Sequence, residues 1–311
     1  MKTILSVSLG SPARDHAVSL RLLGEEVRIE RRGVNGDMRR ALDLYRAMDG
    51  KVDAFGVGGI EFELQVADRR YAWRDARRIR EAVRISKVGD GNGVRAILAR
   101  RAVAALERSL NEQGRTLRGM KALKTTAVAR YALAAELDRA GCEMTYGDFM
   151  FALGLPIPLH TLASVRRLGS ILLPAGTQLP YHWLYALGDE QLAPPVEKWG
   201  RHYAAAELIA GDFLQIRSHM PRDLLAGKII LTNTTTLADV EDLRRRGASL
   251  LVTETPRLEG RSFGSNVIEA LLLALADKPQ DEVGPEDFEE LIDRLSLEPS
   301  VEALAPAEAA R

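Results

Sequence analysis

The sequence predicts an α/β protein with two domains, because three observations agree. Short apolar segments, typical of buried strands, alternate with longer segments whose apolar residues recur every three or four positions. Such alternation favours parallel sheets covered by helices. With 311 residues, of which 46% are hydrophobic and 28% charged, the chain is also long enough to build two hydrophobic cores.

Eight short apolar segments are predicted to be strands. They cover residues 3–8, 26–31, 52–57, 121–126, 142–146, 206–210, 228–232 and 249–253. The first segment, Thr-Ile-Leu-Ser-Val-Ser, is too short for a signal peptide. The chain has no uninterrupted run of 18 apolar residues, so we expect no membrane-spanning helix and a cytoplasmic location.

Four segments between these strands are predicted to be helices. In the first, apolar residues fall at three- and four-residue steps and form one face, and two of the others end at a glycine, the residue favoured just past a helix C-terminus. A run of three threonines before the third offers N-terminal caps. The predicted helices cover residues 94–110, 128–140, 237–246 and 264–276.

The best domain boundary is the polar, glycine-containing segment 111–120, after which a new βαβ pattern begins. We interpret residues 1–110 as an N-terminal α/β domain. Residues 121–276 are interpreted as a Rossmann-like domain with a doubly wound parallel sheet, and the interpretation allows its last helix to pack back on the first domain. A ligand cleft is expected between the two. Residues 277–311 are predicted to form one short amphipathic helix and then a disordered, dispensable acidic tail.

The segment 154–200 is rich in proline and aromatic residues and poor in charge. It fits a buried excursion at a domain or dimer contact, and it also fits a lid that closes over a ligand, because aromatic-rich loops often close sites. A homodimer is the oligomeric state that we expect.

The charge is balanced overall but divided along the chain. The whole sequence has 43 basic and 43 acidic residues, which argues against a protein that relies on global charge to bind nucleic acid or a membrane. Residues 1–150 nevertheless contain 28 basic and 20 acidic residues, whereas residues 277–311 contain 3 and 11. Since 35 of the basic residues are arginine, some of them are candidates to bind an anionic ligand, although genome composition explains the same excess.

Three loops offer candidate site residues. Asp90 lies in a Gly-Asp-Gly-Asn-Gly turn just before a predicted helix, where it could cap that helix or act as a catalytic or hydroxyl-binding carboxylate. The segment 261–266 leads into the last predicted helix and offers an anion site or a simple cap. The segment 125–130 follows a strand at the place where a dinucleotide pyrophosphate would bind, with Asp148 about 20 residues further on, but it lacks the glycine fingerprint.

A metal centre is not predicted. The chain has a single cysteine, Cys142, and five histidines without helical ligand spacing. The histidines are His16, His160, His182, His202 and His219.

Several of these motifs together resemble the bacterial proteins labelled quinate 5-dehydrogenase, distant relatives of shikimate dehydrogenases. The resemblance covers nearly all of residues 1–276. The motifs that carry it are Val7-Ser8-Leu9-Gly10-Ser11-Pro12, Phe55-Gly56-Val57-Gly58-Gly59-Ile60, Tyr146-Gly147-Asp148, Leu153-Gly154-Leu155-Pro156-Ile157-Pro158, Ala210-Gly211-Asp212-Phe213, Thr232-Asn233-Thr234-Thr235-Thr236 and Gly260-Arg261-Ser262-Phe263-Gly264. Two local motifs of shikimate dehydrogenases are similar to Asp90-Gly91-Asn92-Gly93 and Gly264-Ser265-Asn266-Val267-Ile268-Glu269-Ala270, where a Glu replaces the family's Gln.

The resemblance implies an NAD(P)-dependent oxidoreductase that acts on a quinate- or shikimate-like polyol acid, with NAD or NADP as cofactor. It makes Asp90 the catalytic residue, with Lys87 as a possible partner in proton transfer. The implied substrate-binding residues are Asn92, Glu269, Ser265 and Asn266. The implied cofactor-binding residues are Thr125, Thr126, Arg130, Asp148, Asn233, Thr234, Arg261 and Gly264.

A second hypothesis is a non-catalytic sensor that binds a nucleotide, such as a cyclic dinucleotide, in the same cleft. Its motivation is that residues 52–86 contain no lysine where the resembled family has a catalytic one, and that the glycine-rich cofactor loop is replaced by residues 125–130. The arginines would then supply the phosphate contacts.

Overall fold

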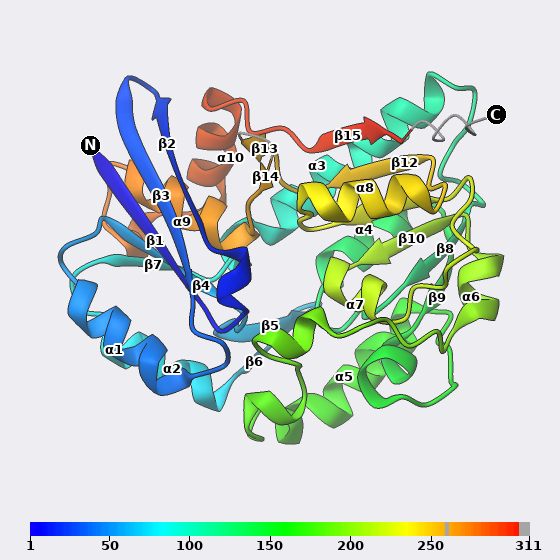
Figure 1. Ribbon diagram of the computed structural model, residues 1–311, viewed down its shortest axis with the longest axis horizontal. Coiled ribbons are helices and arrows are strands. Elements are labelled where there is room, and N and C mark those ends of the chain that lie inside the picture. Colours follow the sequence, from blue (N-terminus) through cyan, green and yellow to red (C-terminus); the bar gives the residue numbers. More distant parts are fainter. Residues whose placement is uncertain (259–260, 305–311) are drawn as a thin grey trace.

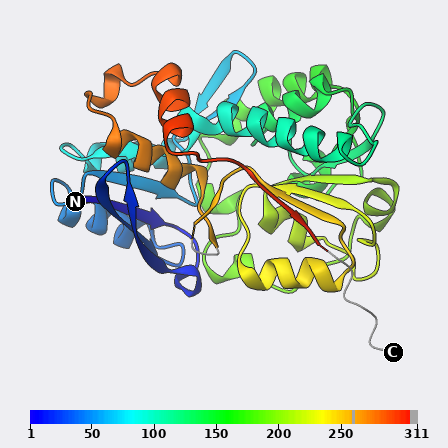
Figure 2. The same ribbon diagram turned by 90° about the horizontal axis from the view of Figure 1, so that it is seen from above.

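The computed structural model describes residues 1–258 and 261–304, which form two α/β domains lying side by side (Figure 1). Each domain is built on its own, mainly parallel sheet with helices on both faces. The view from above in Figure 2 shows the same division. The predicted fold class is therefore confirmed.

Within the described residues, the N-terminal domain has a five-stranded sheet in the order β2-β3-β1-β4-β7. Its strands are parallel except for β2, which forms an antiparallel hairpin with β3. The bounds are β1 (Lys2–Ser8), β2 (His16–Leu22), β3 (Glu25–Gly33), β4 (Ala54–Gly58) and β7 (Lys87–Gly89). A separate hairpin is formed by β5 (Glu63–Val66) and β6 (Arg69–Ala72).

Helices cover both faces of this first sheet, because successive side chains of a strand point to opposite faces. Ile4 packs in the core formed with α9, whereas Leu5 and Val7 pack in the core beneath α1 and α2. The bounds are α1 (Met38–Met48), α2 (Arg74–Ala82), α3 (Asn92–Asn111), α9 (Ser265–Leu275) and α10 (Pro285–Arg294). The last predicted helix, α9, thus packs back on the first domain.

The second domain has, among the described residues, a six-stranded sheet in the order β15-β12-β11-β10-β8-β9. Only β15 is antiparallel to its neighbour. The strand bounds are β8 (Lys121–Lys124), β9 (Glu143–Tyr146), β10 (Leu208–Gly211), β11 (Ile229–Thr232), β12 (Leu250–Thr253) and β15 (Ser300–Ala303). The chain runs from β8 outwards to β9 and then crosses to β10 on the other side of β8. The strand order therefore reverses at β8, which makes the sheet doubly wound.

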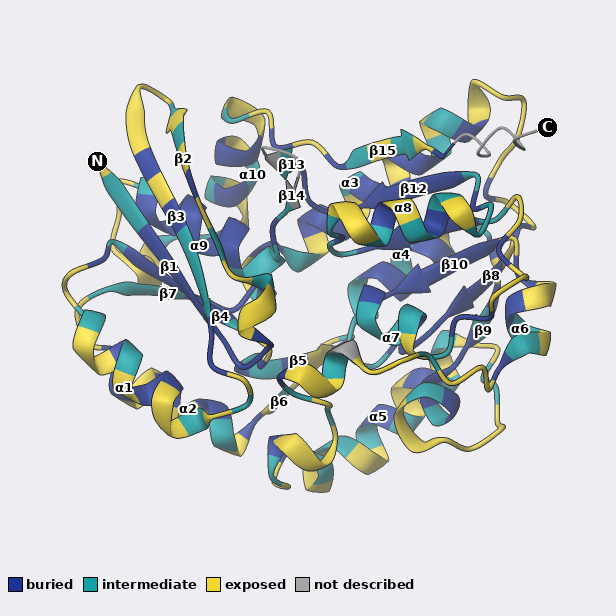
Figure 3. Cartoon of the chain, viewed as in Figure 1, coloured by how far each residue is buried: buried dark blue, intermediate teal, exposed yellow. Residues whose placement is uncertain are grey.

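Two helical layers sandwich this second sheet. One core contains residues of α3 and α4, and the other contains residues of α6, α7 and α8. The helix bounds are α4 (Tyr131–Arg139), α5 (Leu162–Gly176), α6 (Gly200–Ala205), α7 (Phe213–Ser218) and α8 (Leu237–Arg245). A short hairpin of β13 (Arg257–Leu258) and β14 (Arg261–Ser262) leads towards α9. Figure 3 shows that the central strands of both sheets are largely buried and that the outer faces of α1, α2 and α8 are exposed.

Helix α3 belongs to both domains. Its first turns place Val94, Ile97 and Leu98 in the core shared with α9 and α10. Its later turns place Leu106 and Leu110 in the core shared with α4 and the second sheet. One rigid helix therefore connects the two hydrophobic cores.

The acidic C-terminal segment is folded as far as the structure describes it, which corrects the expectation of a disordered tail directly after one helix. That the segment is dispensable stays a prediction. Helix α10 was expected, but β15 was not, and β15 extends the second sheet by pairing with β12. The acidic residues of this segment also form ion pairs with α3, including Arg100 with Glu289 at 2.8 Å and Arg101 with Asp293 at 2.5 Å. Basic residues of the segment 1–150 and acidic residues of the segment 277–311 are therefore paired in the fold. Residues 305–311 lie outside the described part.

The segment 177–191, which we call the strap, leaves the second domain after α5 and docks on the first. The backbone N–H of Gly188 donates to the carbonyl of Leu9 at 3.1 Å, and the N–H of Tyr181 donates to the Asp75 carboxylate at 2.9 Å. Trp73 packs edge-on against Tyr181 with ring centroids 4.9 Å apart. This part of segment 154–200 is therefore an inter-domain contact, and it also borders the cleft described below. None of the described helices is long and apolar enough to cross a membrane.

Candidate functional site

A cleft of about 550 Å³ lies between the two domains, and loops from both sheets line it. On the N-terminal side it is bordered by Ser8 at the end of β1, by Gly58 at the end of β4 and by Asp90 after β7. On the other side it is bordered by loops that follow β8, β10 and β11. Ligands of doubly wound sheets bind at the carboxyl ends of the strands, where the strand order reverses. Both sheets therefore direct their usual binding edge into one cavity.

Asp90 lies at the edge of the cleft with a fixed, buried carboxylate. Its Oδ2 accepts hydrogen bonds from the Phe62 backbone N–H at 2.7 Å and from Asn92 Nδ2 at 2.8 Å, and its Oδ1 accepts one from the Asn92 N–H at 3.0 Å. Gly91, at φ 97°, makes the turn into α3 possible, because a Cβ there would lie 2.3 Å from the Ser265 hydroxyl oxygen. Asn92 itself does not line the cleft but holds Asp90 in place.

Glu269 lies behind this turn and does not line the cleft, which corrects its assignment to substrate binding. Its carboxylate accepts a hydrogen bond from the Gly91 N–H at 2.5 Å and so caps the N-terminus of α3. Burial raises the pKa of Glu269 to about 7, and the negative charge of Asp90 adds to that effect. The position that the resembled family gives to a substrate-binding glutamine is thus structural here.

Lys87 also lies away from the cleft, and this corrects its assignment as a partner of Asp90. Its Nζ donates to the backbone carbonyls of Leu273, Ala276 and Lys278 at 2.7–2.9 Å and thereby caps the C-terminus of α9. The physical reason is the direction of β7. Lys87 begins that strand, whereas only residues at its carboxyl end reach the cleft.

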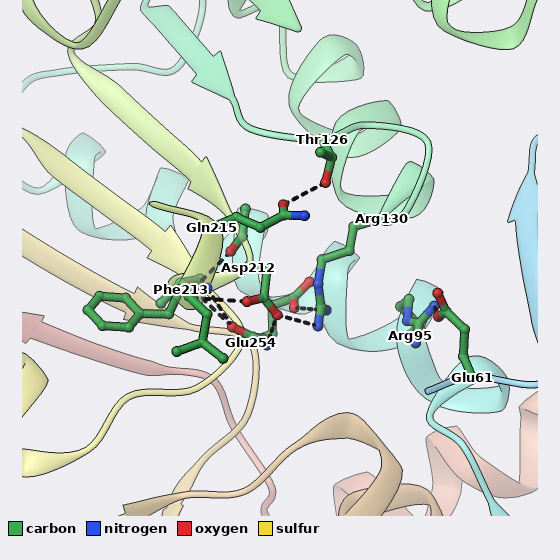
Figure 4. Close-up of polar contacts among 12 residues, drawn as sticks. Glu61, Arg95, Thr126, Arg130, Asp212, Phe213, Gln215 and Glu254 are labelled. Carbon is green, nitrogen blue, oxygen red and sulfur yellow. Dashed lines mark hydrogen bonds and ion pairs between the residues drawn. The ribbon is translucent and has the colours of Figure 1, made fainter. Parts of the chain in front are cut away.

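Two clusters of arginine and carboxylate face each other across the cleft (Figure 4). In the first, Arg95 of α3 contacts the Glu61 carboxylate at 2.5 Å and donates to Asn92 Oδ1 at 2.9 Å. Burial raises the pKa of Glu61, while the charge of Arg95 opposes that rise. Burial alone would lower the pKa of Arg95, but the charges of Glu61 and Asp90 raise it. Each charge of the pair therefore favours the ionised form of its partner, against the effect of burial.

The second cluster comes from the other domain. Arg130, just before α4, contacts the Glu254 carboxylate at 3.1 Å and the Asp212 carboxylate at 3.4 Å. Asn233 Nδ2 donates to Asp212 at 2.7 Å, and Asn233 Oδ1 accepts from the Phe213 N–H at 3.1 Å. Arg130, Asp212, Asn233 and Glu254 follow β8, β10, β11 and β12, respectively. The loops after four neighbouring strands therefore contribute to one polar cluster.

The turn between β8 and α4 is closed by a side chain of the protein. The carboxylate Oδ1 of Asp148 accepts hydrogen bonds from the backbone N–H groups of Ala127 and Val128 at 2.9 and 2.8 Å. These are the amides to which the pyrophosphate of a dinucleotide would bind in a sheet of this kind. Thr125 and Thr126 also direct their hydroxyls to Gln215 rather than to solvent, at 3.2 and 2.7 Å. The residues of this turn do not fit an NAD or NADP pyrophosphate.

The other predicted site residues divide between the cleft and its walls. Ser265 and Asn266 line the cleft, and Asn266 Nδ2 donates to the Ser6 hydroxyl at 3.2 Å. The side chain of Arg261 lies outside the described part of the structure. The predicted residues that line the cleft are Asp90, Thr126, Arg130, Asn233, Thr234, Gly264, Ser265 and Asn266. Those that do not are Lys87, Asn92, Thr125, Asp148 and Glu269.

Several cleft residues were missed by sequence reasoning. Glu61 follows the Gly58-Gly59 turn and Asp212 follows Gly211 at the end of a predicted strand, so their positions after strands were available signals. Tyr181 and Tyr185 of the strap stack on each other at 4.7 Å and also line the cleft. Nothing in the sequence indicated that Glu61 would pair with Arg95, which lies in α3 about one turn beyond Asp90.

The charges that line the cleft are balanced. Among the described lining residues there are four arginines, Arg14, Arg31, Arg95 and Arg130, and four acidic residues, Glu61, Asp90, Glu190 and Asp212. No group of three or more His, Cys, Asp or Glu side chains that could hold a metal ion occurs in the residues that the structure describes.

Comparison with protein families gives two matches. Residues 93–304 match the model described as Domain of unknown function (DUF8754), and residues 3–90 match the model described as Domain of unknown function (DUF8753). No curated protein matches the sequence.

Solved structures with a similar arrangement have low sequence identity to this chain. A galactofuranose binding protein is 11% identical, with 95% of this chain and 99% of that chain covered and a TM-score of 0.37. The NAD-dependent malic enzyme from Thermotoga maritima is 10% identical, with 94% and 84% covered and a TM-score of 0.38. An ABC transporter solute binding protein from Agrobacterium vitis, bound with alpha-D-tagatopyranose, is 8% identical, with 100% and 97% covered and a TM-score of 0.42.

Proposed function

The chain belongs to the DUF8754 family, whose description gives no function, and we propose that it binds a small, hydroxyl-rich molecule of no net charge in the cleft between its domains. The observation that carries the proposal is the pair of arginine–carboxylate clusters. One domain contributes Arg95 with Glu61, and the other contributes Arg130 with Asp212.

Hydroxyl groups suit such clusters because each hydroxyl both donates and accepts a hydrogen bond. The carboxylates of Glu61 and Asp212 are acceptors, and the guanidinium groups of Arg95 and Arg130 are donors. A polyol can therefore use both partners of each pair without separating them. The cavity of about 550 Å³ falls within the range of roughly 300–1,000 Å³ that is usual for small-molecule sites.

A strongly anionic ligand is disfavoured by the same groups. The arginines of both clusters are already paired with buried or half-buried carboxylates, and Asp90 adds a further negative charge. A cyclic dinucleotide would bring two phosphates close to these carboxylates, where the medium screens charge weakly. We therefore retain the non-catalytic hypothesis but replace its nucleotide with a polyol.

Of the two catalytic residues that the oxidoreductase hypothesis names, only Asp90 lines the cleft. Hydride transfer requires a bound nicotinamide and a group that takes the alcohol proton. Lys87 is turned to α9, and the amides that would hold a pyrophosphate are bound to Asp148. Quinate and shikimate remain useful probes, because they are polyols that carry one carboxylate. The homodimer and the cytoplasmic location remain predictions.

The experiment is a binding panel on the purified full chain, measured by thermal stability and calorimetry. The panel contains neutral monosaccharides and cyclitols, quinate, shikimate, NAD, NADP and a cyclic dinucleotide. A ligand at 100 times its Kd should add about 2.7 kcal/mol to the free energy of unfolding. We expect a neutral polyol to do so and the nucleotides to have no effect. Saturable binding of a nucleotide, with no response to any polyol, would refute the proposal.

Two variants test the site itself. Glu61→Gln removes the charge that pairs with Arg95, and it should weaken polyol binding at least tenfold, which is about 1.4 kcal/mol. Glu81→Gln is the matched control, because Glu81 forms an exposed ion pair with Arg77 on α2. If both variants bind the polyol as the wild type does, the ligand does not occupy the cluster of Glu61.

A further inference from the structure

The turn between β8 and α4 lies where the second sheet reverses its strand order, and it carries two backbone amides that point to one carboxylate. Asp148 Oδ1 lies 2.9 Å from the Ala127 nitrogen and 2.8 Å from the Val128 nitrogen. Successive amides in a turn before a helix form a concave anion site. In this chain the Asp148 carboxylate occupies that site.

Asp148 reaches the turn from the neighbouring strand. It opens the π-helical turn Asp148–Ala152 that follows β9, and only 4% of its surface is exposed. Its second carboxylate oxygen, Oδ2, is buried and has no hydrogen-bond partner among the described residues. A buried carboxylate with half of its acceptors unused is a costly arrangement, so the two amide contacts must hold it firmly.

A buried cation lies close to this carboxylate. Lys124, at the end of β8, is fully buried and donates from Nζ to the Thr126 carbonyl at 2.7 Å. Burial lowers the pKa of Lys124 to about 8, and the charges of Asp148 and Glu254 counteract that effect. Burial raises the pKa of Asp148, whereas the two amides and Lys124 lower it. The turn is therefore an electropositive pocket whose anion is a side chain.

We propose that Asp148 is a specificity-determining residue that occupies the anion site of this turn and thereby excludes phosphate-bearing ligands from the second domain. A phosphate needs the amides of Ala127 and Val128, and each amide has only one N–H to donate. This inference rests on the proposed function, in which the ligand is a polyol without phosphate groups. The test of the inference does not require a polyol.

The test compares the wild type with Asp148→Ala and Asp148→Asn. Alanine leaves both amides without an acceptor, whereas asparagine refills the site with a neutral group of the same shape. Each protein is titrated with inorganic phosphate, and separately with formate, at constant ionic strength set with sodium chloride. Melting temperature and calorimetric Kd are recorded. We expect the apparent Kd for phosphate to be at least tenfold lower in Asp148→Ala than in the wild type and Asp148→Asn.

The outcomes separate cleanly. Phosphate binding by Asp148→Ala alone supports the proposal. Stabilisation of this variant by formate without any phosphate binding overturns it, since the site would then accept a carboxylate but not a phosphate. If Asp148→Ala does not fold, the test uses the wild-type protein instead. Its backbone amide hydrogen exchange is measured with and without NAD. Protection of Ala127 and Val128 by NAD refutes the exclusion, and unchanged exchange supports it. Failure of every polyol to bind would refute only the proposed function.

Discussion

The carboxyl group of Glu269 should make the stability of the whole protein depend on pH. It is buried against α3, accepts the Gly91 N–H at 2.5 Å and faces the charge of Asp90. Replacing it in Glu269→Gln keeps the shape and one acceptor oxygen, for the Gly91 N–H, and removes the ionisation. The comparison of the two proteins therefore isolates the free energy of ionising one buried carboxyl group.

The magnitude follows from the pKa of Glu269, which is raised from 4.5 to about 7 in the fold. Below pH 4.5 the group is protonated in both the folded and the unfolded chain. Between pH 4.5 and about 7 the unfolded chain releases its proton and the folded chain keeps it, so the free energy of unfolding falls as the pH rises. At about 1.36 kcal/mol per pH unit, the total loss is about 3 kcal/mol.

The assay is urea unfolding of both proteins at pH 5 and pH 8. We expect Glu269→Gln to exceed the wild type by less than about 1 kcal/mol at pH 5 and by about 3 kcal/mol at pH 8. The control is Glu81→Gln, the same exchange at an exposed glutamate of α2. A difference between Glu269→Gln and the wild type that is the same at both pH values would show that the carboxyl group ionises normally.

Three further substitutions test the roles assigned above. Lys87→Met removes the cap of α9 and should cost about 2 kcal/mol in urea unfolding, while calorimetry should find the affinity of the cleft for its polyol unchanged. Gly91→Ala places a Cβ 2.3 Å from the Ser265 hydroxyl oxygen at positive φ, so both stability and polyol affinity should fall, and equal affinity would contradict the role of this turn. Thr236→Ala breaks the capping box of α8 and should cost about 1 kcal/mol in urea unfolding, and an unchanged free energy of unfolding would contradict the role of this cap.

The sequence predicted the parallel cores well because their signals are local. The segment 228–232, for example, is a short aliphatic run between polar residues, and it forms the fully buried strand β11. Strand β2 was missed; it lies at the edge of the sheet, and Val18 is its only buried residue, while Leu20 and Leu22 are partly buried. Strand β15 was missed for a related reason, since it is four residues long and exists only through pairing with β12.

Some of the predicted site residues line the cleft, whereas others lie in its walls. Asp90 was singled out because it lies in a glycine-rich turn before a predicted helix, and Arg130 because its segment follows a predicted strand. Both residues line the cleft. Glu269 and Lys87 were misassigned because a motif does not reveal which way a side chain turns. The pairing of Arg95 with Glu61 joins residues 34 positions apart, and only tertiary packing brings them together.

The sharing of α3 between both cores has a consequence for how this chain can be divided. The two family matches meet between residues 90 and 93, where α3 begins. A fragment cut there would lack Val94, Ile97 and Leu98, which cover the first sheet together with α9. The remainder would carry α9 with its apolar side chains uncovered. The two halves are therefore poor candidates for exchange as modules, and we expect neither to be stable when expressed without the other.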